Sequence, residues 1–445
     1  MTSQTTKTPL LPADDPWRAA LHNEVHARPA ARIRLPALVV YVAVLNAGIT
    51  REQECAHLRR LPGQTDLALG SLNDNFLRLL FEGYTVKWER HTEFTRYSIV
   101  QPLPQHAGLG ALAQDSEPEL SASLVVSAEW LHSLPGVTVA AIQMAMVQAD
   151  LSNPAQLIEQ AQDWFGGRTV LASQIGQGHS WAVSELRIGQ DGFERMLIIA
   201  PPGTSEERSG RSSHRLLEME TYRLMALRGL PVAKELGPML SDCESTLANI
   251  TVLLDQKNAS DQNLLDQLIS LAATVERATA THGYRFSATR AYATLVEQRI
   301  AELREKAISG KQPIGNYLQH RFSPAIATVA ATEKRLHALS ERIARASALL
   351  RTRVDIATET QNSQLLEKLT RGQELQLRLQ STVEGLSIAA ISYYVVSLLL
   401  YAGKALKGAG LPINPEIAAG ALIPAVLWAV WRGTRLVRNK IIVSP

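Results

Sequence analysis

A polar segment near the N-terminus, LHNEVHARP, carries Glu24, His26 and Arg28 within five residues. In an extended backbone alternate side chains share a face, so Glu24 and His26 would stand together and could bind one cation. In a helix the two side chains diverge by about 200° and could not share a ligand. The other interpretation is a polar segment before a strand, in which Arg28 pairs with one of these side chains. The sequence leaves both interpretations open.

A second polar motif, WERHTEF at 88–94, contains Glu89, Arg90, His91 and Glu93. If this segment is one strand, Glu89, His91 and Glu93 stand on one face, each about 6.6 Å from the next. Two carboxylates around an imidazole can act as metal ligands or as an acid/base group. Lys87 lies on the same face, so a solvated or salt-bridged surface is the alternative.

The third motif, SSHRLLEMETYRLMALRGLP at 212–231, has the pattern of a helix that ends at its GLP. His214 and Glu218 are four residues apart, and Glu220 and Arg223 are three apart, so each pair can meet on the helix surface. Such pairs stabilise helices, and we expect this role unless the three polar motifs converge in space. Convergence in one cleft would instead indicate a site.

The sequence excludes several classes of function. It contains no Walker loop, no GxGxxG helix start, no GxSxG elbow and no HExxH, so it predicts no catalytic residue and no enzyme of those classes. Lys and Arg number 45 against 42 Asp and Glu, and this small excess predicts no nucleic-acid partner. Cys55 and Cys243 are too far apart for a CxxC site. No cofactor is indicated, and a divalent cation is the one ligand that the Glu and His motifs suggest.

Two apolar segments near the C-terminus predict a transmembrane hairpin. Gly385 to Gly403 is uncharged over its whole length, which as a helix spans about 28 Å, the thickness of a hydrocarbon core. The second, Ile417 to Trp431, is shorter and contains Pro424, which we expect to kink it. A buried core hairpin is the alternative. Lys and Arg are more frequent outside the hairpin than in its loop, and the N-terminal residues lack a signal-peptide pattern, so we expect both termini in the cytosol.

One face of the first predicted span carries hydroxyl groups, from Ser387, Tyr394, Ser397 and Tyr401. Hydroxyls within a bilayer need partners on other helices or in water. This face therefore predicts packing against other copies of the span, either as ordinary helix contacts or as the lining of an aqueous path.

The elements that must position these motifs form an α+β domain followed by helices. Residues 34–46 predict a buried strand, 50–60 a helix capped by Thr50, 84–100 an alternating strand, and 169–200 two or three strands with glycine turns. After residue 205 only helical patterns follow. Pro324, behind Ser323, is expected in the first turn of a stalk helix, in which a heptad repeat from Leu336 to Leu350 predicts an imperfect coiled coil.

The predicted division has five parts. They are a cytosolic α/β sheet domain at 1–204, a helical domain at 205–322, a long stalk helix at 323–384, a transmembrane hairpin at 385–431 and a basic cytosolic tail at 432–445. No helix stop separates the stalk from the first span, so the two are expected to be continuous.

At the three polar motifs and at QLRLQSTVEGLSIAAISYY, 376–394, the sequence resembles a bacterial family of uncharacterised membrane-anchored proteins, a domain of unknown function. This resemblance covers nearly the whole chain and implies a place in the bacterial cell membrane, but it brings no activity. The layout of a cytosolic α/β domain, a long stalk helix and two C-terminal spans also resembles the CorA-type magnesium channels, which assemble as pentamers. Their diagnostic Gly-Met-Asn is absent, and LLLYAGKALKGAG stands in its place.

An enzyme that uses Glu89, His91 and Glu93 is the least favoured class of function, because no nucleophile or complete set of metal ligands accompanies them. Two other classes of function remain. The first is a CorA-like homo-oligomeric ion channel or transporter in the bilayer, with cytosolic Glu and His side chains as regulatory ligands. The second is a membrane-tethered cytosolic module that binds a partner or ligand, for which the hairpin is only an anchor. A pore requires several copies, whereas the tethered module should keep its activity when the chain ends near Ala357.

Overall fold

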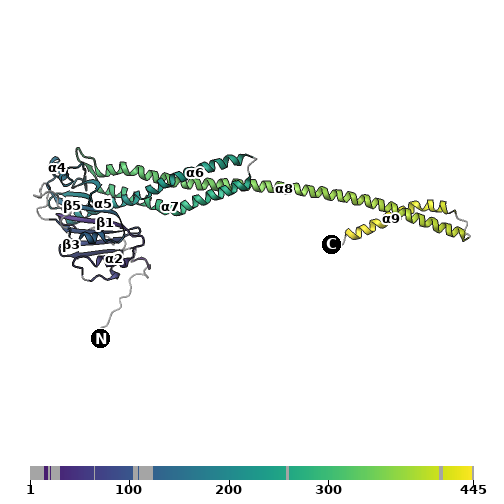
Figure 1. Ribbon diagram of the computed structural model, residues 1–445, viewed down its shortest axis with the longest axis horizontal. Helices are drawn as coiled ribbons and strands as arrows, with labels where there is room; N and C mark the ends of the chain where they lie inside the picture. Colours follow the sequence, from purple (N-terminus) through teal and green to yellow (C-terminus); the bar gives the residue numbers. More distant parts are fainter. Residues whose placement is uncertain are drawn as a thin grey trace, which may run out of the picture. The chain divides into compact units, whose positions relative to one another are not determined.

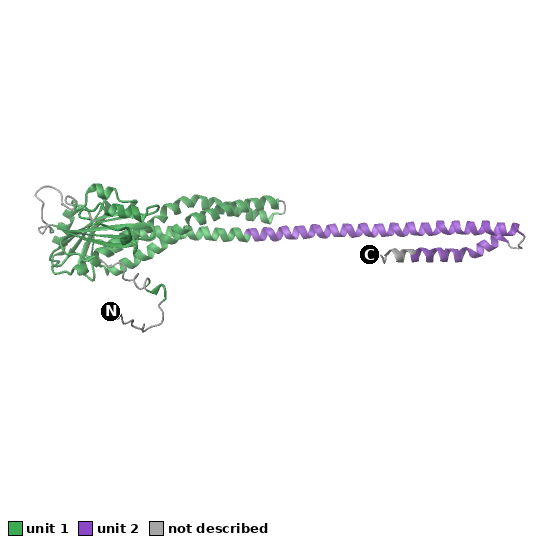
Figure 2. Cartoon of the chain, turned by 90° about the horizontal axis from the view of Figure 1, so that it is seen from below, with its two compact units in different colours: residues 1–345 green, residues 346–445 purple. Residues whose placement is uncertain are grey.

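The computed structural model describes residues 15–18, 21, 31–64, 66–103, 109, 124–256, 260–409 and 414–442. The chain divides into two compact units, residues 1–345 and 346–445 (Figure 2). The first unit contains a mixed β-sheet with helices, as the sequence predicts. The second consists of the greater part of a long helix and one further helix.

Within the described residues nine strands form one sheet, in the order β2-β3-β4-β1-β5-β8-β7-β6-β9. Neighbouring strands are antiparallel except β5 and β8, which run parallel. The strands are β1 (Ala37–Leu45), β2 (Phe76–Phe81), β3 (Tyr84–Arg90), β4 (Phe94–Pro102), β5 (Val137–Gln148), β6 (Leu171–Ile175), β7 (Ser180–Ile188), β8 (Glu194–Ala200) and β9 (Lys306–Ala307).

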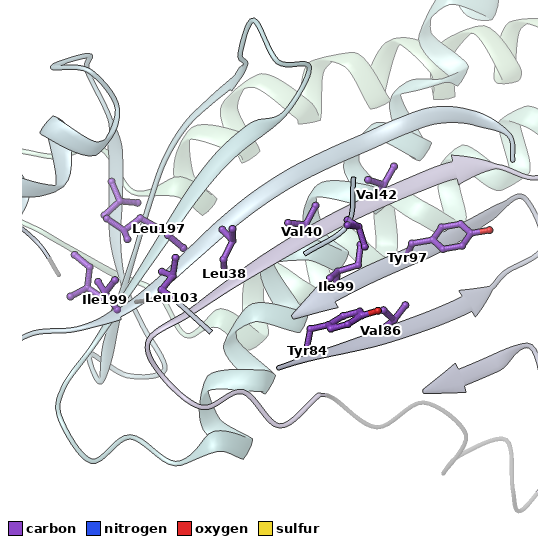
Figure 3. Close-up of a cluster of buried hydrophobic side chains, with 14 of the residues drawn as sticks. Leu38, Val40, Val42, Tyr84, Val86, Tyr97, Ile99, Leu103, Leu197 and Ile199 are labelled. Atoms are coloured by element: carbon purple, nitrogen blue, oxygen red, sulfur yellow. The ribbon is translucent and has the colours of Figure 1, made fainter. Parts of the chain in front are cut away.

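Strand β1 is an inner strand of the sheet, between β4 and β5 (Figure 1). Its sequence, ALVVYVAVL, is buried on both faces, which explains why it is an apolar β-branched run and does not alternate with polar residues. Side chains on one face of the sheet, among them Val40, Val86 and Tyr97, form one hydrophobic core (Figure 3). Val39 and Tyr41 point to the other face, where helices form a second core.

The helices of the first unit divide between these two faces. The shorter ones, α2, α3 and α4, contribute Leu58, Trp130 and Leu157 to the first core. The longer ones, α5, α7 and the beginning of α8, cover the second core. The bounds are α2 (Arg51–Leu58), the 3-10 turn η1 (Leu69–Leu72), α3 (Ala128–His132), α4 (Pro154–Trp164), α5 (Glu206–Leu227), α6 (Gly229–Asp255), α7 (Asp261–Leu303), α8 (Ile314–Gly408) and α9 (Pro415–Ile442).

Helices α6, α7 and the first part of α8 run side by side (Figures 1 and 2). Arg335 of α8 forms an ion pair with Glu244 of α6 at 2.8 Å. Leu336, Leu339 and Ile343, which belong to the heptad repeat, are buried. This part of the repeat is therefore covered by helices of its own chain.

Two helices of the described chain are long and apolar enough to cross a membrane. One is α8, in which the apolar stretch follows the stalk without a break, and the other is α9, which includes Pro424. Helix α9 folds back along the C-terminal part of α8 (Figure 2), and Ser392 of α8 is buried there. These helices fit a membrane-anchored protein.

The structure corrects three local predictions. A short strand, β9, follows residue 205, where only helical patterns were expected, and it pairs with β6. Residues 84–100 are not one strand, because β3 ends at Arg90 and β4 begins at Phe94. Helix α8 begins at Ile314, before the expected start at Ser323, and continues through Pro324. The other expected elements, the buried strand, the Thr50-capped helix and the strands between 169 and 200, are confirmed as β1, α2 and β6 to β8.

Candidate functional site

A group of buried charges lies between the sheet and the long helices. It starts on β3 and β4, where the hairpin register places Glu89 directly opposite Arg96. Arg96 Nη2 donates to Glu89 Oε1 at 2.9 Å, and its Nε bonds the other carboxylate oxygen. Lys87 Nζ lies 3.1 Å from Glu89 Oε1. All three side chains are at most 5% exposed, so the strand face that looked solvated in the sequence is interior.

Helix α5 supplies the second carboxylate of the group, from Glu218. Arg96 Nη1 donates to Glu218 Oε1 at 3.0 Å, so this one guanidinium joins two carboxylates from different elements. Arg299 of α7 donates to Glu218 Oε2 at 2.8 Å. The Tyr222 hydroxyl and His214 Nε2 both lie 3.2 Å from Glu218 Oε1. The sheet, α5 and α7 are thus joined through one side chain. We call Lys87, Glu89, Arg96, His214, Glu218 and Arg299 the charged cluster.

The charged cluster continues to the surface through α7. Arg299 Nη1 donates to Glu302 Oε1 at 2.7 Å, and Arg215 of α5 lies 3.4 Å from the other oxygen of Glu302. On its inner side, the Tyr41 hydroxyl of β1 is 2.7 Å from the hydroxyl of Thr221. The charged cluster therefore extends to the outer face of the helices, and a separate hydrogen bond joins β1 to α5.

The electrostatics keep the carboxylates ionised. Burial raises the pKa of Glu89, but Arg96 and Lys87 outweigh it and the pKa falls to about 2. Burial also opposes ionisation of Glu218, whereas His214 in its protonated form, Arg96 and Arg299 lower its pKa below the usual range. For His214 burial dominates over the attraction of Glu218, and the pKa falls to about 4. At neutral pH His214 is therefore uncharged, and the guanidiniums balance Glu218.

The charged cluster is suited to holding α5 and α7 on the sheet. Glu89 and Glu218 already accept from cations of their own chain, so their lone pairs are engaged. Removing either partner of such a pair leaves a buried charge uncompensated, which costs about 3–5 kcal/mol. Among the described residues no group of three or more His, Cys, Asp or Glu side chains is arranged to hold a metal ion. The divalent cation remains a prediction.

The candidate residues from the sequence fall into different places. Glu24, His26 and Arg28 lie outside the described residues. The second and third polar motifs do converge, because Glu89, His214 and Glu218 meet around Arg96. Nothing in the spacing of either motif alone indicates this.

The rest of the second motif does not join the charged cluster. His91 and Glu93 lie in the turn between β3 and β4, so they cannot share a strand face with Glu89. The His91 ring stacks on Phe94 at 4.6 Å between centroids. Glu93 pairs with Arg285 of α7 at 2.7 Å. The proposed Glu-His-Glu face is therefore wrong.

Arg90 points to the other side of the sheet. It forms an ion pair with Glu54 of α2 at 2.7 Å and donates to the carbonyl of Ile49 at 2.8 Å. Thr95 donates to the second oxygen of Glu54 at 2.7 Å. This group fixes α2 on the hairpin in the way that the charged cluster fixes α5 on the opposite face.

A third polar contact fixes the beginning of α8. The Glu305 carboxylate accepts from the backbone N–H of Gly315 at 2.9 and 3.1 Å and from the hydroxyl of Ser173 on β6. The Ser173 hydroxyl in turn accepts from the N–H of Ile314 at 2.8 Å. A carboxylate at a helix N-terminus satisfies free N–H groups and complements the helix dipole. This contact explains why α8 begins at Ile314 and not at the proline.

Two residues of the charged cluster, Arg96 and Arg299, were not predicted. Arg96 had a signal, because an arginine inside the apolar strand FTRYSIV calls for a buried partner. A turn at His91–Glu93 would have placed it opposite Glu89. Arg299 had no such signal in the sequence, since it lies 81 residues from Glu218.

Comparison with known proteins adds a family but no activity. Residues 13–441 match the sequence model of a family described as "Protein of unknown function (DUF3422)". No curated protein matches the chain.

Proposed function

The chain belongs to the DUF3422 family of proteins of unknown function, and we propose that it is a homo-oligomeric membrane protein that acts as an ion channel or transporter. In this proposal α8 and α9 cross the bilayer, both termini lie in the cytosol, and the first unit is a cytosolic head. The CorA-like layout that the sequence suggests is part of the proposal.

One observation carries the proposal. Helix α8 is a single helix of 95 residues, which begins at the Glu305 cap in the first unit and includes the apolar stretch of the first candidate span. An anchor alone does not need this continuity, since a flexible linker would tether a soluble domain equally well. A continuous helix can transmit a rotation or a shift of its cytosolic end to the membrane.

The hydroxyl face of α8 supports transport. Tyr394 and Tyr401 are both 68% exposed, whereas Ser392, on the side where α9 lies, is 4% exposed. The packing of α9 therefore leaves Ser387, Tyr394 and Tyr401 of this face exposed and Ser397 partly buried. In a membrane this face would meet another copy or water.

The head would serve as the regulatory part. The charged cluster and the Glu305 cap fasten α5, α7 and α8 to the sheet. A ligand that competed for these carboxylates would loosen the start of α8. Because Glu89 and Glu218 are already neutralised by arginine, a regulatory cation would have to displace Arg96.

The membrane-tethered module is the second candidate. It is favoured by the first unit's own two hydrophobic cores, which lie within residues 1–345. In that case transport would be absent, and a protein ending near Ala357 would keep the activity of the full chain.

Flux through proteoliposomes containing the full-length protein tests the proposal. We expect K⁺ or Mg²⁺ flux above that of empty liposomes, and we expect Ser397→Ala to change it severalfold. Ser392→Ala is the matched control, because it removes the same hydroxyl from the face covered by α9. Flux equal to that of empty liposomes, or equal effects of the two substitutions, would contradict the proposal.

A further inference from the structure

The stalk part of α8 has an apolar surface that the described residues of the chain leave exposed. Every described side chain from Asp355 to Val383 is exposed. Four of them, Leu365, Leu369, Leu379 and Val383, are 58–67% exposed although they are large and apolar. Outside a bilayer, a repeated apolar surface of this kind marks an interaction site.

Some of the apolar residues form one stripe, whereas Leu366 and Leu377, which are similarly exposed, lie outside it. At about 100° per residue, Leu365, Leu369, Gly372, Leu379, Val383 and Leu386 lie within an arc of about 100°. Leu365, Gly372, Leu379 and Leu386 are spaced by seven residues, and the others interleave with them. A seven-residue apolar repeat is the pattern of a helix that supercoils with a similar helix.

The stripe continues into the candidate span. Tyr394, Ser397 and Tyr401 fall within the same arc, whereas Ser392 lies about 180° away. Ser392 is buried on the side of α9, so α9 packs on the opposite face of α8. Within the described part of the second unit, the stripe from Leu365 to Tyr401 is exposed, except that Ser397 is partly buried.

We propose that a second copy of this chain occupies the stripe, with the two α8 helices parallel and in register. This deepens the proposed function, because it names the surface through which the copies meet. The apolar segment of α8 supplies the reason for the register. Copies anchored in one membrane by the same residues present identical stripes at the same height and in the same direction.

Two polar residues within the stripe favour a fixed register. The polar residues within the stripe, Lys368 and Gln376, are of the kind that fixes register in coiled coils.

Cysteine cross-linking in native membranes tests the interface. Cys55 and Cys243 are both buried and would be replaced by alanine in the full-length protein. Leu379→Cys, on the stripe, is compared with Leu377→Cys, which is equally exposed but lies about 160° away. With copper phenanthroline or a short bis-maleimide we expect at least about fivefold more cross-linked oligomer for Leu379→Cys. Equal yields, or no product at either position, would overturn the proposal.

A second pair of variants separates the interface from transport. We expect Leu379→Asp to reduce the oligomeric fraction in nanodiscs at least about tenfold, and Leu377→Asp to leave it unchanged. If both aspartate variants stay oligomeric and transport ions, the interface is wrong and the proposed function stands. If the cross-links form as expected but the liposomes show no flux, the interface stands and the transport function is wrong.

Discussion

Replacing Arg96 tests whether the charged cluster holds α5 and α7 on the sheet of the first unit. Arg96 is 3% exposed and bonds Glu89, which is 1% exposed, and Glu218, which is 6% exposed. Arg96→Met would keep most of the side-chain volume but leave two buried carboxylates without the cation between them. Breaking a buried pair in this way costs about 3–5 kcal/mol.

Two cations remain beside the carboxylates in this variant, and they determine where in the range of about 3–5 kcal/mol the loss of stability falls. Lys87 stays 3.1 Å from Glu89, and Arg299 stays 2.8 Å from Glu218. We therefore expect the lower end, a loss of about 3 kcal/mol in the free energy of unfolding. With a urea slope of about 3 kcal/mol per molar, the unfolding midpoint would fall by about 1 M.

The assay is urea unfolding of the full-length protein in nanodiscs, followed by tryptophan fluorescence. Trp88 and Trp181 are buried in the first unit and report on its core. Arg335→Met is the matched control, because it breaks an ion pair with Glu244 whose side chains are 41% and 33% exposed. Such a pair is worth less than about 1 kcal/mol. Equal urea unfolding midpoints for the two variants would refute this role of the charged cluster.

Three further predictions follow from the structure. His57 and His214 both have a pKa of about 4 in the fold, below that of an unfolded histidine. Unfolding therefore takes up protons between about pH 6.5 and 4, and the free energy of unfolding falls as the pH falls through this window. His214→Gln should make this loss of unfolding free energy smaller. Gly315→Ala would place a Cβ 2.6 Å from the Glu305 carboxylate, so we expect the thermal unfolding midpoint to drop by several degrees in a fluorescence scan, and no drop would contradict the described start of α8. A chain ending near Ala357 should be released from membranes into the soluble fraction, whereas the full-length protein should stay in the pellet after alkaline carbonate extraction.

The sequence predicts the elements of this protein better than their contacts. The β-branched run of β1 and the Thr50 cap of α2 are local signals, and both elements form as expected. The strand at 84–100 was wrong because WERHTEF contains neither glycine nor asparagine at its turn. The strand-like alternation of the sequence therefore continues across His91–Glu93, although the backbone reverses direction there.

The charged cluster was only partly predictable. His214 and Glu218 meet because they are four residues apart on one helix, which is a local relation. The contact of Glu218 with Arg96 spans 122 residues, and it depends on how α5 crosses the sheet. No spacing rule contains that information. The start of α8 was missed for the same reason, since Ser173 and Glu305 are 132 residues apart.

The mass of the full-length protein in nanodiscs tests the central claim most directly, because a channel or transporter with a shared α8 interface requires several copies. We expect one oligomeric species, a ring of about five chains if the assembly is CorA-like. A monomer at all protein concentrations would contradict both the shared interface and the proposed function, and would leave α8 and α9 as an anchor.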